Sequence, residues 1–188
     1  MTSRDVVVLV GSLRKESLSR KVALAIAELA PGTLRLEVVE IRGLPLYDAD
    51  LETMPPEPWT SFRARVRSAD AILFVTPEYN RSVPGALKNA IDVASRPKAQ
   101  NAWEAKPAAI VSVTPSALGG YGANHHLRQS LVTVNVPTMP QPEAYLGNAG
   151  SLFDAEGRLV DEKTREFLVK FARAFADWIE VLRAPRRT

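Results

Sequence analysis

Runs of consecutive apolar residues alternate along this chain with longer segments in which apolar residues recur every three or four positions. The first run is "DVVVLV" (5–10), and the segment that follows it, "LSRKVALAIAEL", has the spacing of an amphipathic helix. Further apolar runs predict strands over 33–41, 71–76 and 107–115, and "PTMPQPEAYL" can hold a short fifth strand that its prolines confine to a sheet margin. Helical periodicity predicts helices over 60–69, 86–95, 123–134 and 161–183.

This alternation predicts a parallel sheet covered by helices on both faces, because each strand is apolar at nearly every position. Five such units indicate an α/β, flavodoxin-like, doubly wound fold with strand order 2-1-3-4-5. With 188 residues and no linker-like segment, we expect a single domain over residues 1–188. Thr60 is a plausible cap for its helix, whose arginines we expect on a solvated face. Phe167, Phe171, Phe175 and Trp178 form an apolar stripe expected in the core.

Three polar loops follow the first, third and fourth predicted strands. They read "GSLRKESLS", "TPEYNRSVPG" and "TPSALGGYG". The carboxyl ends of parallel strands meet at one edge of the sheet, which is where ligands bind in open α/β folds. The candidate site is therefore the place where these three loops meet.

The first loop has the chemistry of a phosphate site without either common nucleotide motif. It matches neither G-x-G-x-x-G nor G-x-x-x-x-G-K-[ST]. It does offer hydroxyls at Ser12, Ser17 and Ser19, a guanidinium at Arg14 and the N–H groups of a helix start, all of which suit a terminal phosphate monoester. The alternative is that the serines only cap the helix.

Composition and charge exclude several other classes of protein. The net charge is +3 with scattered cations, so a concentrated nucleic-acid surface is not expected. The chain has no cysteine, which removes disulfides, thiolate metal sites and a nucleophilic thiol. The first apolar run is too short for a signal peptide or a membrane span. We expect a cytoplasmic protein that does not associate with a membrane.

Three segments together resemble a known family. "GSLRKES", "TPEYNRSVPGALKNAID" and "HHLRQSLVTVNVPTMPQPEAY" closely resemble the NAD(P)H-dependent FMN reductase family, in its quinone and chromate reductase branch, over about residues 6–146. The resemblance implies bound FMN and two-electron reduction of quinones and similar small-molecule acceptors, with NAD(P)H as the electron donor. Ping-pong kinetics are expected because the nicotinamide and the acceptor should both stack on one exposed flavin face, and an open flavin site would also accept chromate, azo and nitro compounds. The resemblance also implies a homodimer or a homotetramer.

The resemblance further implies a set of FMN-binding residues, one group in each loop. The residues that would bind the phosphate lie in the first loop and at the start of the first helix; they are Ser12, Arg14, Ser17, Leu18 and Ser19. The flavin ring would run along the loop after the third strand and meet the loop after the fourth strand at its pyrimidine end, through Pro77, Glu78, Tyr79, Asn80, Ser116, Leu118, Gly119 and Gly120. The prolines of the middle loop would hold its backbone in place beside the ring.

The sequence allows more than one role for several other polar residues. Arg81 either contacts an anionic reactant at the mouth of the site or pairs with a carboxylate. His125 and His126 are adjacent, so on a helix they diverge and do not form a metal site; a role in an oligomer interface is expected instead. Asp48, Asp50 and Glu52 are expected at the surface, and no metal is expected. A flavodoxin-type electron carrier remains the alternative function, although such carriers are usually strongly acidic.

Overall fold

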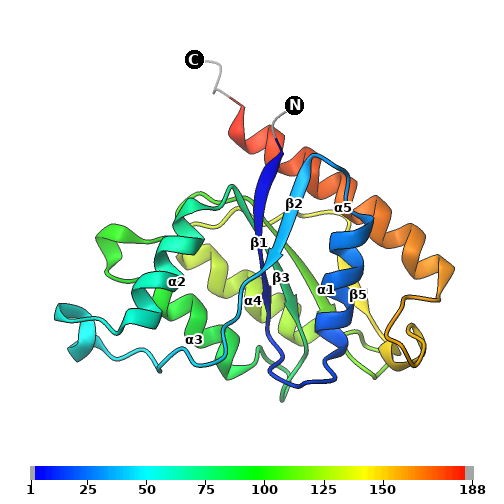
Figure 1. Cartoon of the computed structure of the whole chain (residues 1–188), viewed down its shortest axis with the longest axis horizontal. Coiled ribbons are helices and arrows are strands. Elements are labelled where there is room, and N and C mark those ends of the chain that lie inside the picture. The colour runs from blue at the N-terminus through cyan, green and yellow to red at the C-terminus, as the bar shows by residue number, and fades with distance from the viewer. Residues whose placement is uncertain (1–2, 185–188) are drawn as a thin grey trace.

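The five apolar runs form the five strands of one parallel sheet in the computed structural model, which describes residues 3–184 (Figure 1). The strand order is β2-β1-β3-β4-β5, and every neighbouring pair is parallel. The predicted flavodoxin-like fold is therefore confirmed. The strands are β1 (Arg4–Val10), β2 (Leu34–Val38), β3 (Ala71–Thr76), β4 (Ala108–Val113) and β5 (Ala144–Leu146).

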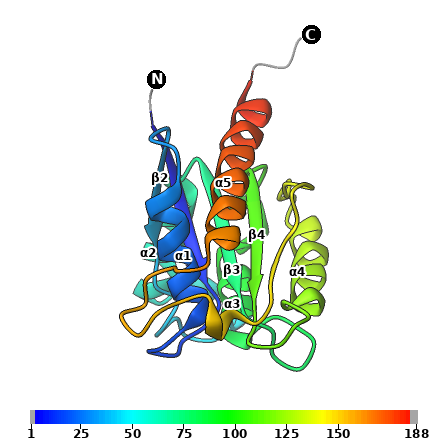
Figure 2. The same ribbon diagram turned by 90° about the vertical axis from the view of Figure 1, so that its right-hand side faces the viewer.

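Five α-helices within the described residues cover the two faces of this sheet. One face packs against α1 and α5, which lie side by side in Figure 2, and the other packs against α2, α3 and α4. The helices are α1 (Leu18–Leu29), α2 (Glu57–Ser68), α3 (Gly85–Ala94), α4 (Tyr121–Thr133) and α5 (Glu162–Arg183). Three short 3-10 helices lie between them at Ala49–Thr53, Lys98–Gln100 and Ala149–Ser151.

The position of each strand explains its hydrophobic pattern. All six residues of β3 and of β4 are buried, because helices cover both sides of these central strands. The edge strand β2 instead alternates buried or half-buried residues with exposed ones. β5 has only three residues, which fits the prolines that precede it. On α5, Phe171 and Phe175 are fully buried.

The register brings three strand ends together. Val10 of β1 lies beside Val75 of β3, and Thr76 of β3 lies beside Ser112 of β4. The loops after these strands consequently emerge next to one another, at the lower end of the molecule in Figure 1. This is the edge at which the sequence predicts a site.

One expectation about α2 is wrong, and a second holds only in part. The helix begins at Glu57 after Pro56, and the Thr60 hydroxyl donates to the Glu57 carbonyl within the first turn instead of capping the helix. Proline at the helix start needs no partner for an N–H group, so a side-chain cap is less necessary there. Arg63 is buried: its Nε donates to the Val93 carbonyl at 2.8 Å, and its guanidinium pairs with Glu52 at 3.2 Å. The predicted solvated face of α2 is thus only partly solvated.

Candidate functional site

A cavity of about 240 Å³ opens where the loops after β1, β3 and β4 meet. Eight of the thirteen predicted cofactor-binding residues line it, together with three residues that the sequence did not single out. The lining residues are Ser12, Arg14, Ser17, Leu18, Ser19, Pro77, Glu78, Tyr79, Val113, Thr114 and Pro115. The structure therefore brings the first two predicted groups together in one place.

The start of α1 supplies the polar wall of this cavity. Ser17 caps the helix, its Oγ accepting from the Arg20 N–H at 3.1 Å, so the capping alternative is correct for this serine. Ser19 is 2% exposed, yet its hydroxyl makes no hydrogen bond within residues 3–184. Arg14 is exposed and has no carboxylate within ion-pair distance in the same range. A free hydroxyl, a free guanidinium and a helix start together fit a phosphate group.

The loop that carries Arg14 is supported from both sides. Gly11 lies so close to β3 that a Cβ there would be 3.1 Å from the Thr76 hydroxyl and 3.2 Å from Leu87 and Pro77. On the other side, the Arg42 guanidinium donates to the Leu13 carbonyl. The loop backbone is thus held by contacts that leave the Arg14 side chain free.

The loop after β3 contains a tight two-residue turn. Tyr79 and Ser82 exchange two backbone hydrogen bonds of 3.0 Å, and the central residues, Asn80 and Arg81, have φ angles of +51° and +63°. Asparagine tolerates this left-handed region, whereas arginine adopts it at a cost of about 1 kcal/mol. Asn80 lies in the turn and does not line the cavity.

The side chain of Arg81 points largely into solvent. It is 74% exposed, and its Nη1 lies 3.9 Å from Oε1 of Glu78. This separation is the upper limit of an ion pair, so the guanidinium remains available to other anions. Both alternatives for Arg81 therefore stay open.

The loop after β4 packs mainly against β5. A Cβ on Gly119 would lie 2.7 Å from the backbone of Tyr145, and one on Gly120 would lie 3.0 Å from Ser112. Ser116 and Leu118 are exposed, and none of these four residues lines the cavity. The close approach that both glycines permit is to the protein's own strands.

Val113, Thr114 and Pro115 also line the cavity, although they were not predicted from the sequence. A signal was present, because the triplet Val-Thr-Pro occurs where β3 and β4 each pass into a loop, at 75–77 and 113–115. Both triplets follow neighbouring parallel strands, so both lie at the same edge of the sheet, although the second extends two residues further. The repeat could therefore have identified the second wall of the cavity.

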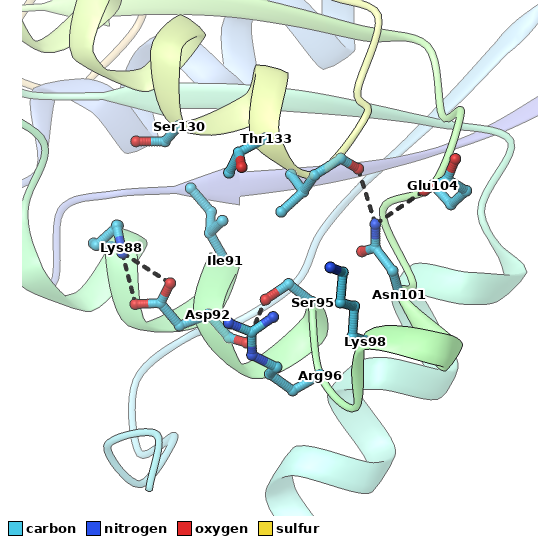
Figure 3. Close-up of a pocket in the computed structure, with 11 residues that line it drawn as sticks. Lys88, Ile91, Asp92, Ser95, Arg96, Lys98, Asn101, Glu104, Ser130 and Thr133 are labelled. Carbon is cyan, nitrogen blue, oxygen red and sulfur yellow. Dashed lines mark hydrogen bonds and ion pairs between the residues drawn. The ribbon is translucent and has the colours of Figure 1, made fainter. Parts of the chain in front are cut away.

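A larger cavity, of about 510 Å³, lies elsewhere, between the C-terminal halves of α3 and α4 (Figure 3). None of the predicted site residues lines it. Some of its polar groups pair with one another: Lys88 Nζ lies 2.8 Å from Asp92, and the Asn101 amide donates to Glu104 and to the Val134 carbonyl. The smaller cavity contains eight of the predicted site residues and an Arg14 guanidinium without an ion pair among residues 3–184, so we take it as the candidate site.

The two histidines contact other elements of the same chain. His125 Nε2 lies 3.1 Å from the Tyr145 hydroxyl, and His126 Nδ1 lies 3.0 Å from the Ser82 hydroxyl. Burial, and to a smaller extent a hydrogen bond to Glu143, raises the pKa of Tyr145 to about 12.

Residues 3–184 contain no group of three or more His, Asp or Glu side chains able to hold a metal ion. In the same range, no helix has both the length and the apolar content required to cross a bilayer.

Comparisons with known proteins identify the family of this chain. A family model described as NADPH-dependent FMN reductase matches residues 4–151. A quinone reductase from Pseudomonas putida is 61% identical over 181 residues, which cover 96% of this chain and 97% of the relative. A 2-hydroxy-1,4-benzoquinone reductase from a Burkholderia species is 43% identical and covers 93% and 95% of the two chains.

A solved structure has the same fold over nearly its whole length. It is FerB, a flavoenzyme NAD(P)H:(acceptor) oxidoreductase from Paracoccus denitrificans, with a TM-score of 0.89 and 43% sequence identity. The match covers 95% of this chain and 98% of FerB. The chain therefore belongs to the NADPH-dependent FMN reductase family and is an oxidoreductase that works with FMN and NAD(P)H.

Proposed function

We propose that this protein reduces quinones with electrons from NAD(P)H, using FMN held at the cavity between the loops after β1, β3 and β4. The observation that carries the proposal is the wall formed by Ser12, Arg14 and Ser19 at the start of α1. When bound, FMN supplies the hydride chemistry, and the protein binds and orients it. The names of the relatives, a quinone reductase and a benzoquinone reductase, support quinones as acceptors.

The residues present fit FMN in specific ways. The phosphate would lie against Arg14, Ser12 and Ser19 at the start of α1, where the helix N–H groups add a partial positive charge. The ring would lie along Pro77, Glu78 and Tyr79. Asn80, Ser116, Leu118, Gly119 and Gly120, which do not line the cavity, remain predicted contacts. A cavity of about 240 Å³ is smaller than most pockets that enclose a cofactor, so the ring would stay accessible.

We also propose that the nicotinamide and the acceptor use this site in turn. A single small cavity at the strand ends does not accommodate two further planar rings together, and an open site suits chromate, azo and nitro compounds as well as quinones. Initial rates measured at several acceptor concentrations should give parallel double-reciprocal plots. Intersecting lines would show a ternary complex and refute the shared site.

A flavodoxin-type electron carrier is the second candidate, because it would share both the fold and the cofactor. Electron carriers of this type are usually strongly acidic, whereas this chain has a net charge of +3. The two functions separate in one experiment: the purified protein should turn over many equivalents of NADPH with benzoquinone and no added reductase. A single flavin reduction without turnover would favour the carrier.

We further propose a homodimer or homotetramer in the cytoplasm. The surface formed by α4 and residues 137–145 mixes apolar groups with Arg128, Glu143 and Tyr145, a composition that suits an interface between subunits. Tyr121, at the start of α4, is 56% exposed and lies 4.2 Å from the His125 ring, centroid to centroid. Light scattering tests the oligomer directly.

A further inference from the structure

The first turn of α4 lacks a cap of its own. The residue before the helix is Gly120, which has no side chain to accept from the N–H groups of that turn. Such groups need an acceptor, usually a Ser, Asp or Asn at the cap position. The acceptor here comes from another loop: Oε2 of Glu78, in the loop after β3, accepts from the Ala123 N–H at 3.0 Å.

The first turn is shaped to receive this carboxylate. A Cβ on Gly122 would lie 2.9 Å from Oε2 of Glu78 and 3.0 Å from the Arg81 carbonyl, so any larger residue would push the loop away. A second contact lies one turn further along, where the Ser82 hydroxyl meets His126 at 3.0 Å. The loop after β3 is thus attached to α4 at two points.

The Glu78 carboxylate is committed to this contact. It is only 13% exposed, the partial positive charge of the helix start faces Oε2, and the Arg81 guanidinium is the neighbour of Oε1. By accepting this hydrogen bond, the Glu78 carboxylate links the loop after β3 to α4. The same residue lines the cavity together with Pro77 and Tyr79.

We infer that Glu78 is a positioning residue that fixes one wall of the cofactor cavity by capping α4 from across the site. It sets the distance between the loop after β3 and the loop that leads into α4, and so fixes the main chain of 77–79 against which the flavin ring would lie. The inference rests on the proposed FMN site. It predicts that the geometry of Glu78, rather than its charge, controls cofactor affinity and potential.

Three variants separate geometry from charge. Glu78→Ala removes the acceptor, Gly122→Ala displaces it, and Glu78→Gln keeps an acceptor oxygen while it removes the charge. We expect the first two to weaken FMN binding by about tenfold, because part of the binding free energy would then be used to order the loop that the cap holds in the parent protein. Both should also shift the midpoint potential of bound FMN in the same direction. Glu78→Gln should bind FMN with the affinity and the midpoint potential of the parent protein.

The matched control is Asp161→Ala. Asp161 caps α5, its Oδ1 accepting from the Thr164 N–H at 2.7 Å, and none of the cavity residues belongs to that helix. This variant removes an N-terminal carboxylate cap away from the site, so FMN affinity and potential should not change. Amide exchange in the FMN-free protein gives an independent measurement: Glu78→Ala should speed exchange at Ala123, whereas Asp161→Ala should not.

Several results would overturn the inference. They are a Glu78→Gln variant as impaired as Glu78→Ala, a Gly122→Ala variant that binds FMN like the parent, unchanged exchange at Ala123 in Glu78→Ala, and an effect of Asp161→Ala on FMN. Failure of the site itself has a different signature, because Arg14→Ala would then leave FMN affinity unchanged. Weaker FMN binding in Arg14→Ala with normal binding in Glu78→Ala would reject only the positioning role.

Discussion

Replacing Arg14 with alanine tests the phosphate site most directly. The Arg14 side chain makes no ion pair within residues 3–184, so its removal should cost little besides its interaction with the ligand. A hydrogen bond to a charged group contributes about 1.5–3 kcal/mol, which corresponds to about 10- to 150-fold in Kd. Because Arg14 is exposed and partly screened by salt, we expect the lower part of that range, about 10- to 30-fold at 0.15 M salt.

The assay compares two ligands that differ only in the phosphate. The FMN-free protein is titrated with FMN and with riboflavin, and binding is followed by the quenching of flavin fluorescence. Arg14→Ala should weaken FMN binding and leave riboflavin binding unchanged. Lys15→Ala is the matched control, because it removes the same charge from the same loop at an exposed residue that does not line the cavity.

Two results would refute the reasoning. If Arg14→Ala weakened FMN and riboflavin equally, Arg14 would support the loop instead of contacting phosphate. If Lys15→Ala had the same effect as Arg14→Ala, only the net charge near the site would matter.

The remaining predictions concern the mouth of the site, assembly and alkaline stability. Arg81→Ala should raise KM for NADPH and acidic acceptors more than for a neutral quinone, with a difference that shrinks in salt; equal effects would assign Arg81 to structure. Glu143→Lys should shift the oligomer to a smaller species in light scattering, and a monomeric parent would refute this; Arg128 is a poorer target because it also donates to Asn124 and Met139 within the chain. Since the pKa of Tyr145 is raised to about 12 from 10.0, the folded state holds its proton longer than the unfolded state, so stability should fall as the pH rises from about 10 to 12. Tyr145→Phe should flatten this loss in chemical denaturation series, and an unchanged slope would contradict the assignment.

The fold could be predicted because the central strands are buried on both sides. The run 71–76 and the helix 18–29 match β3 and α1 in both bounds, since apolar runs and helical periodicity are local properties of the sequence. The start of α2 and the burial of Arg63 could not be predicted in this way. Arg63 is buried because of partners in other elements, Val93 and Glu52, and no periodic pattern indicates such partners.

The position of the site could be predicted for those residues that directly follow a strand. Ser12, Arg14 and Glu78 follow strands whose order is set by the fold, so the sequence places them at one edge. The cap that Glu78 provides for α4 was not predictable, because Ala123 lies 45 residues further along the chain. The free side chain of Ser19 likewise depends on the packing around it.

The tight packing of the loop after β4 has a consequence for how this enzyme could be altered. A Cβ on Gly147 would lie 2.5 Å from the Ala117 carbonyl, just as one on Gly119 would collide with Tyr145. Substitutions at these glycines would disturb two elements at once and leave few active variants. Leu13 and Leu118 instead have exposed side chains on the loops that follow β1 and β4. A mutant library meant to broaden the range of acceptors should therefore randomise Leu13 and Leu118 and leave the glycines intact.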